Sequence, residues 1–482
     1  MGLLVAFLLF AILAGIVSVR TVRLKAAQTA QPGAYRESTD TAGAQKLAQA
    51  IRIPTVSCLE TEKTDWAAFT QFHKLLEQQF PLVHLRCEKT VIHGYSLLYR
   101  WPGIPSCPGQ KPILITAHMD VVPVEPGTES AWQQPPFSGN LANGAVWGRG
   151  ALDTKVHLIA AMQAMEQLIG EGFTPARDIY LGFGHDEEIT GEEGARHIAD
   201  YLAKSGITFD FVLDEGGCVV QNVLEGVSQP IAMVGVGEKG FANIRLSVRL
   251  DGGHSSMPAP HTSLGVLAKA LCLIEAHPFK PRLIPSTQAF LLKLAPYMHG
   301  AQRVILANLW LFRPLFVRVF SKTNTGSALL RTTVAVTMAQ GSPAPNVVPQ
   351  HSTACINCRI LPGENDQTMM EHFRKLLRKL PVKVEAITLD EPSALSSSDS
   401  ESFRFVESLI HACCGDTLVV PYLVMASTDA RKYEAVSEHI YRFTPYVIDQ
   451  QDLGRIHGTD ETISIVNVNR CIDFFTALMK NA

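Results

Sequence analysis

The chain has little excess charge, few cysteines and only one long apolar run without charged residues. In 482 residues, 42 Lys and Arg face 45 Asp and Glu, so the net charge is −3. Without a basic excess there is no electrostatic basis for binding nucleic acid. Ten cysteines in a chain of this length do not form the disulfide framework of a small secreted protein. With 46% hydrophobic residues, the chain is long enough for two globular domains.

Two short motifs are misleading. Cys355 and Cys358 have the spacing of a redox or zinc-binding pair, but residues 353–361 are predicted to form a strand. Residues three apart in a strand lie on opposite faces, so we interpret this pair as structural. Residues 235–240 match the glycine fingerprint of dinucleotide-binding proteins, yet a strand is predicted after them where the fingerprint requires a helix.

The long apolar run lies at the N-terminus. Residues 2–19 are apolar and uncharged, which is within the lower range for a membrane span. Basic residues follow the run: Arg20, Arg23 and Lys25. A signal sequence or membrane anchor is therefore predicted over residues 1–25, and basic residues after the run favour a retained anchor. A polar linker is predicted over residues 26–46.

Residues of the types that bind zinc follow several short apolar runs. The runs at 112–117, 178–184 and 209–213 alternate with helical segments, which predicts buried parallel strands of an α/β sheet. Ligands of such sheets bind beyond the carboxyl ends of the strands. Asp153 lies just before the helix predicted over residues 155–169. The apolar residues of this helix recur at spacings of three and four. The candidate ligands are His118, Asp153, Glu188, Asp214 and His457.

The charges of these residues suit a pair of zinc ions. Two Zn²⁺ carry four positive charges, and three carboxylates with a bridging hydroxide carry four negative charges. If Asp153 bridges the ions, each has three protein ligands and an open position for water. Glu187 is then free to act as the general base that activates this water. Asp120, two residues after His118, is expected to fix the imidazole tautomer.

Distinct motifs surround these residues: 118–123, 148–153, 185–188, 214–217 and 457–458. From about Leu47 to the C-terminus, the chain resembles peptidase family M20, the dinuclear zinc aminoacylases and carboxypeptidases. Within that family it is most similar to the N-fatty-acyl-amino acid synthase/hydrolase branch, near the vacuolar carboxypeptidase S group. The narrower match rests on residues 252–256, 308–312, 346–349 and 441–443.

The resemblance implies how the ligands are shared. One zinc would take His118 and Asp214, the other Glu188 and His457, and Asp153 would bridge the two. Thr154 stands where many relatives have a second aspartate. This departure removes a charge without removing a ligand, and it leaves the geometry of the preceding peptide bond open.

The resemblance also implies an α/β architecture with an insertion. A catalytic domain with a mainly parallel central sheet is expected over residues 47–237 and 362–482. Between them, an α+β lid that forms a homodimer is expected over residues 238–361. The change of pattern near Glu238 agrees with this expectation, because strands are predicted at 241–250, 331–339 and 354–360.

Several residues of the insertion and the C-terminal part are candidates for substrate binding. His254 alone would be an ordinary turn histidine, but the resemblance implies that it reaches the partner's active site and binds the oxyanion. Arg359 resembles the family's carboxylate-binding arginine, and Asn346 is expected to donate near the lid hinge. Asp429 and Arg431 either line the pocket or form an ion pair within their loop.

Residues 304–320 are strongly apolar. They are expected either in the lid core or a dimer contact, or as a wall for an acyl chain. Arg303, Arg313 and Arg318 argue against a second membrane span, and Pro314 is expected to break a helix there.

The sequence therefore predicts a dizinc amidohydrolase that cleaves, or reversibly forms, N-acyl amino acids with long acyl chains. A metallo-carboxypeptidase or dipeptidase is the alternative. An inactive binding homologue is disfavoured because Glu187 and all five ligands are present together. The enzyme is expected to be membrane-anchored or secreted, with its catalytic part exported.

Overall fold

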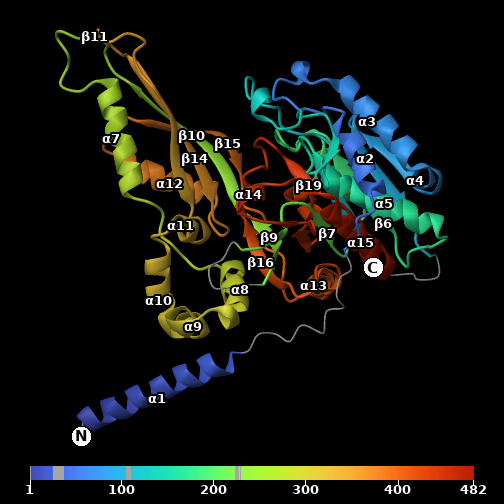
Figure 1. The fold of residues 1–482 in the computed structure, drawn as a ribbon. Helices are drawn as coiled ribbons and strands as arrows, with labels where there is room; N and C mark the ends of the chain where they lie inside the picture. Colours follow the sequence, from blue (N-terminus) through green and yellow to red (C-terminus); the bar gives the residue numbers. More distant parts are fainter. Residues whose placement is uncertain (1, 25–36, 105–109, 223–226, 228) are drawn as a thin grey trace.

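A ten-stranded sheet forms the centre of the larger domain (Figure 1). The computed structural model describes residues 2–24, 37–104, 110–222, 227 and 229–482. The strands lie in the order β1 (Glu88–Ile92), β2 (Ser96–Trp101), β6 (Ile179–Gly184), β3 (Ile113–His118), β7 (Val212–Asp214), β17 (Ile440–Arg442), β9 (Ile231–Glu238), β8 (Val219–Val220) and β18 (Val447–Ile448), with β16 (Leu418–Val424) also beside β9. The central strands β6, β3, β7 and β17 are mutually parallel, which confirms the predicted fold class.

Helices cover both faces of this sheet. Alternate residues of β3 point to opposite sides, so Ile113 and Ile115 join one apolar core and Leu114 joins another. The larger core contains α2 (Ala42–Ile51), α3 (Trp66–Gln79), α4 (Pro81–Arg86), α5 (Lys155–Gly170), α13 (Glu401–Cys414) and α15 (Ile465–Asn481). The smaller core contains α6 (Ala195–Lys204) and the 3₁₀ segment η4 (Asp429–Ala435). Helix α5 was expected to bury one face, but it is buried on nearly all sides because α2, α4 and α15 enclose it.

A second, four-stranded antiparallel sheet forms the inserted domain. Its order is β12 (Thr333–Gln340), β14 (His351–Ile360), β10 (Gly240–Arg249) and β15 (Lys383–Asp390), and α7 (Ser263–Ala276) and α12 (Asp366–Leu377) pack on it. The inserted domain continues beyond residue 361, the end predicted for it, because β15 pairs with β10 in this sheet. Met369 and Phe373 of α12 share a core with Ile244, so this helix and β15 belong with the insertion. Beyond this sheet, β11 (Gly253–His254) pairs with β13 (Val347–Val348).

The strand pattern confirms how the two misleading motifs were interpreted. Burial alternates along β14, so Cys358 is buried in the small domain's core while Cys355 lies on the other face. After residues 235–240 the chain continues as β10, which is a strand and not the helix of a dinucleotide site.

The N-terminal helix α1 (Gly2–Arg23) projects from the body below α9 (Gly300–Ala307) and α10 (Leu309–Phe320) (Figure 1). By length and composition α1 could cross a membrane, a test that signal sequences also pass. Most of the predicted linker lies outside the described residues. Its last five residues are not a linker, because α2 begins at Ala42 and buries Ala44 and Leu47 in the larger core.

The apolar segment 304–320 forms α9 and α10. Its buried residues Leu306 and Leu309 join the core of the larger domain, so the expectation that they lie in the lid core is wrong. Helix α10 also continues through Pro314, contrary to prediction. A proline removes one backbone hydrogen bond, but packing of Leu309 before it and of the stacked Phe316 and Phe320 after it holds both halves in line.

Candidate metal centre

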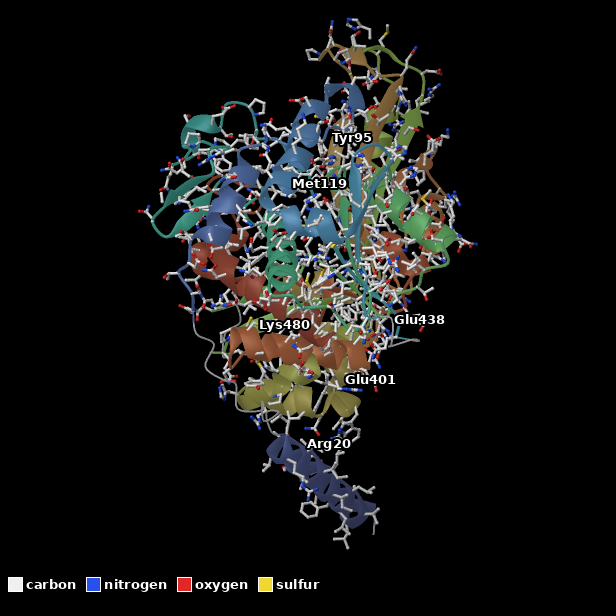
Figure 2. All side chains as sticks on the ribbon, turned by 90° about the vertical axis from the view of Figure 1, so that its right-hand side faces the viewer. Arg20, Tyr95, Met119, Glu401, Glu438 and Lys480 are labelled. Atoms are coloured by element: carbon white, nitrogen blue, oxygen red, sulfur yellow. The ribbon has the colours of Figure 1, made fainter. Side chains whose placement is uncertain are left out.

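The parallel strands bring their last residues to one edge of the sheet. His118 ends β3 and Asp214 ends β7, and the two strands pair with Ile115 opposite Leu213. The neighbouring strand β6 leads into the loop that carries Glu187 and Glu188. In Figure 2 Met119, the residue after His118, lies within the body, far from the projecting α1 that carries Arg20. The site is thus inside the larger domain.

Asp120 orients both His118 and the following loop. Nδ1 of His118 lies 2.9 Å from the backbone oxygen of Asp120 and 3.4 Å from its carboxylate, so this ring nitrogen carries the proton. Nε2 is then free to bind a metal. The Asp120 carboxylate accepts hydrogen bonds from Ser57 Oγ at 2.6 Å and from the backbone N–H groups of Glu187 and Glu188 at 3.2 and 3.1 Å.

Asp153 lies between two histidines and presents a different oxygen to each. Its Oδ1 is 3.1 Å from Nε2 of His118, and its Oδ2 is 3.0 Å from Nε2 of His457. Nε2 of His457 is also 3.2 Å from Oε2 of Glu188. The ligand atoms of His118, Asp153 and Glu188 all lie within 4.8 Å of one another. The structure therefore brings four of the five predicted ligands into direct proximity, with Asp214 on the adjoining strand.

Glu461 holds the loop that presents Asp153, a role that the sequence did not reveal. Its buried carboxylate accepts hydrogen bonds from the N–H groups of Gly150, Leu152 and Asp153 and pairs with Arg149 at 2.7 Å. The same arginine donates to the backbone oxygen of His457. The peptide bond between Asp153 and Thr154, left open by the sequence, is cis. Glu461 thus ties the Asp153 loop to the His457 loop.

The site concentrates buried carboxyl groups. Burial is the main cause that raises the pKa of Glu187 well above its usual range, and the charges of Glu188, Asp429 and Glu215 act in the same direction. Burial and the neighbouring Asp153 raise the pKa of Glu188 to about 7. Burial likewise raises the pKa of Asp214. Such a cluster requires compensating positive charge to remain ionised.

The donor set fits divalent zinc. Two ligands about 2.0–2.1 Å from a tetrahedral ion are roughly 3.3 Å apart, close to the spacings around Asp153. Both carboxylate oxygens of Asp214 are buried and accept no hydrogen bond of good geometry among the described residues, although the Thr116 hydroxyl and the Glu215 N–H lie close enough to lower the pKa of this carboxyl. Acceptor positions therefore remain for an ion. Imidazole nitrogens and carboxylates are ligands that zinc accepts. The residues present therefore fit the implied metals.

Glu215 is a further buried carboxyl group at the site, and the sequence did not mark it as a site residue. It follows Asp214 directly, and burial together with the charges of Asp153 and Asp214 raises its pKa well above the usual range. It forms part of the recognised motif 214–217, which was the only signal that could have identified it.

Arg359 lies on β14 without a carboxylate partner among the described residues. Its guanidinium lies 4.8 Å from the ring centroid of Phe241. Partial burial and the nearby Arg431 lower its pKa. An arginine stacked on a ring and free of a protein carboxylate is suited to an anionic ligand.

Arg431 and Asp429 do not form the ion pair considered as an alternative. Arg431 instead donates to Glu238 at 3.2 Å and to the backbone oxygen of Lys239. Asp429 is buried, and one of its carboxylate oxygens has no partner within the described ranges. Its charge acts on Glu187, so Asp429 borders the metal centre while Arg431 braces the junction with the insertion.

His254 and Asn346 lie together at the far end of the insertion. His254 is exposed on β11, and its Nδ1 contacts Ser256 Oγ at 2.8 Å. The backbone oxygen of Asn346 accepts from Ser255 at 3.1 Å, so Asn346 lies beside His254 and not near the hinge, where it was expected. Figure 1 shows β11 at the tip of the insertion, away from β7. Neither residue joins the metal centre of its own chain.

Comparisons with known proteins agree with this site. A family model described as Peptidase family M20/M25/M40 matches residues 114–481. Probable carboxypeptidase S-like 2 of Dictyostelium discoideum is 39% identical over 443 residues, covering 91% of this chain and 84% of the relative. N-fatty-acyl-amino acid synthase/hydrolase PM20D1 of Xenopus tropicalis is 35% identical, covering 91% and 85%.

A solved structure gives the same fold. The M20 family metallo-carboxypeptidase Sso-CP2 of Sulfolobus solfataricus superposes with a TM-score of 0.67 at 18% identity, covering 91% of this chain and 98% of the other. At that identity the structural likeness shows the fold alone, and the family rests on the sequence matches. The chain belongs to peptidase family M20/M25/M40 and is a hydrolase that acts on amide bonds.

Proposed function

We propose that the chain is a dizinc amidohydrolase that cleaves, and in reverse forms, N-acyl amino acids with long acyl chains. The observation that carries the dinuclear part is the position of Asp153, whose two oxygens lie against two different imidazoles at 3.1 and 3.0 Å. A carboxylate so placed can bridge two ions, which His118 and Asp214 on one side and Glu188 and His457 on the other would hold. When bound, the ions polarise the substrate carbonyl and lower the pKa of water at the site.

Glu187 is the proposed general base. Its carboxylate lies 3.9 Å from Nε2 of His118, close to the ligands, yet it is assigned to neither ion. This position beside the ligands suits a group that takes a proton from the attacking water and delivers it to the leaving nitrogen. In the synthetic direction the same carboxyl group transfers the proton from nitrogen to oxygen. It accepts a proton from the attacking amine and returns it to the departing oxygen.

Arg359 is proposed to bind the substrate carboxylate, because its guanidinium has no protein carboxylate to pair with in the described part of the chain. Asp429 would border the pocket behind Glu187. A fixed arginine fork distinguishes a free carboxylate from an ester or amide, so substrates would need an unblocked amino-acid end.

The acyl preference is inferred from relatives. Proteins of Xenopus tropicalis and Mus musculus at 35% and 33% identity are named N-fatty-acyl-amino acid synthase/hydrolases. The alternative is a carboxypeptidase, a name carried by the relatives from Dictyostelium discoideum and Saccharomyces cerevisiae at 39% and 29% identity. Both activities would use the same ligands and the same arginine, so only the substrate separates them.

A substrate panel should distinguish the two activities. With one amino acid and acyl chains from acetyl to oleoyl, kcat/KM is expected to rise with chain length by orders of magnitude, because each buried methylene contributes about 0.8 kcal/mol. Dipeptides, which offer a polar amine in place of the acyl chain, should be poor substrates. Efficient dipeptide cleavage without activity on long acyl chains would instead establish the carboxypeptidase.

We also propose that the chain forms a homodimer in which His254 acts at the partner's site, and a mixing experiment tests this. If His254 acts in the partner's site, inactive His254→Ala chains mixed with inactive Glu187→Gln chains should recover activity, because one site of each mixed dimer has both residues intact. Random exchange would restore about one quarter of the wild-type activity. Exchange demonstrated by differently labelled chains, but with no recovery, would show that His254 does not act in trans.

A further inference from the structure

The N-terminal helix is attached to the body by specific polar contacts. Arg303 of α9 donates to the backbone oxygens of Thr21 and Leu24 at the end of α1, at 3.4 and 2.6 Å. Nδ2 of the buried Asn308 lies 3.1 Å from Thr21 Oγ1 and 3.3 Å from the Val17 oxygen. An arginine at the last carbonyls of a helix satisfies orphan acceptors and favours the helix dipole. The position of α1 is therefore fixed at α9 and α10.

Helix α10 exposes an apolar face beside this attachment. Trp310, Pro314 and Arg318 follow one another at spacings of four, and Leu311, Leu315 and Val319 form the adjacent row. Trp310 and Leu315 are each 52% exposed and Val319 is 58% exposed. The opposite side of the helix, with Leu309, Phe316 and Phe320, packs on the larger core. The guanidinium of Arg20 on α1 lies 6.0 Å from the Trp310 ring, so this face adjoins α1.

The surrounding sequence is free of acidic residues. Between Glu275 and Glu364 there is no Asp or Glu, although the chain as a whole has 45 of them and a net charge of −3. The same interval contains nine basic residues: Lys280, Arg282, Lys293, Arg303, Arg313, Arg318, Lys322, Arg331 and Arg359. An apolar helix face that includes tryptophan, in a segment whose charged residues are all basic, is typical of a helix at a lipid headgroup boundary.

We propose that α1 is a retained membrane anchor and that α10 lies flat on the bilayer that α1 enters, with the face of Trp310, Leu311, Leu315 and Val319 among the lipids. Arg318 would meet the headgroups, because long basic side chains extend from an apolar boundary towards charge. Arg313 instead donates to the backbone oxygen of Leu283 at 2.8 Å and holds α10 to the body. The occupant is lipid because the face adjoins a helix long and apolar enough to span a bilayer. The body would thus have a fixed orientation on the membrane and would not swing on a tether.

Fluorescence quenching in vesicles tests this proposal with the full-length protein. The protein is inserted into phosphatidylcholine and phosphatidylglycerol vesicles with or without bromine on the acyl chains, which quenches tryptophan by contact. The chain has five tryptophans, so the difference in fluorescence between wild type and Trp310→Phe gives the emission of Trp310. We expect brominated lipid to remove most of this emission and to leave the emission of Trp66, Trp101, Trp132 and Trp147 nearly unchanged.

A pair of variants provides the control. Leu315→Glu combined with Val319→Glu should abolish the quenching of Trp310 while α1 still holds the protein to the vesicles. Met257→Glu changes an 84% exposed residue in the turn that follows β11 and should leave the quenching unchanged. These side chains are largely exposed, so neither change opens a cavity in the core.

Three results would overturn the proposal. Quenching of Trp310 by aqueous acrylamide and not by bromine would place the face in water. Protection from both quenchers would mean that protein, such as a second copy of the chain, covers it. Mass spectrometry showing that α1 is removed from the protein recovered from its native membrane would eliminate the anchor.

Discussion

Replacement of Glu187 by Gln is expected to lower kcat by about 10²–10⁴ and to leave the metal content unchanged. Glutamine keeps the shape of the side chain but cannot accept the proton of the attacking water. The Glu187 backbone N–H would still donate to Asp120, so the loop should keep its position. Turnover of an N-acyl amino acid and metal analysis of the same preparation provide the two measurements.

Glu188→Gln is the matched control, because it makes the same chemical change one residue later. Oε2 of Glu188 lies 3.2 Å from Nε2 of His457, among the proposed ligands, so this variant should lose metal as well as activity. If Glu187→Gln retained full turnover, the general base would have to be another group.

Removal of the metals is expected to abolish hydrolysis and to make stability depend on pH in a defined direction. In the metal-free protein, burial and Asp153 raise the pKa of Glu188 from 4.5 to about 7. The folded state then binds more protons than the unfolded state between these two values. The contribution of Glu188 to stability is therefore fully present below pH 4.5 and falls by about 3 kcal/mol as the pH rises to 7.

His457 changes stability in the same direction at higher pH. Its hydrogen bonds with Asp153 and Glu188 raise its pKa from 6.5 to about 10, so its stabilising charge is lost as the pH rises through that value. Zinc bound as proposed would replace these protons, so the metal-loaded protein should show a flatter profile. Thermal unfolding of the chelated and zinc-restored protein from pH 5 to 8 measures the difference. If the chelated protein lost no more stability than the zinc-restored protein between pH 5 and 8, or if it remained active, the ligand assignment would be contradicted.

The positions of the ligands that follow apolar runs could be predicted, because the formation of a buried strand depends on the residues of the run itself. The runs before His118 and Asp214 are too apolar for anything but buried strands, and parallel strands in one sheet must end at the same edge. The geometry around Asp153 agrees with the proposed bridge for a further reason. A glycine-bounded loop before a helix can approach the strand ends closely, and Gly150 adopts a φ of 88°.

Features that depend on distant contacts could not be predicted. Glu461 accepts hydrogen bonds from the backbone of a loop more than 300 residues earlier in the chain. No local sequence pattern distinguishes a carboxylate that makes such distant contacts. The sequence pattern predicts that the insertion ends at residue 361, yet Met369 and Phe373 beyond that residue pack in its core. Pro314 predicts a helix break from local geometry alone, but the packing of α10 overrides that tendency. The roles of His254, Arg359 and Asn346 stay predictions, because they depend on a substrate or a second chain.

The position of β17 decides when the site can form during biogenesis. This strand, residues 440–442, lies between β7 and β9 in the central sheet, although more than two hundred residues separate it from β7. A nascent chain that lacks it has an open sheet edge at Asp214 and lacks His457 and Glu461. Such an edge is prone to pair with other chains, so residues 440–442 protect the carboxyl end of β7 once they have been synthesised. The proposed metals could therefore load only after β17 and the loop with His457 and Glu461 have joined the sheet.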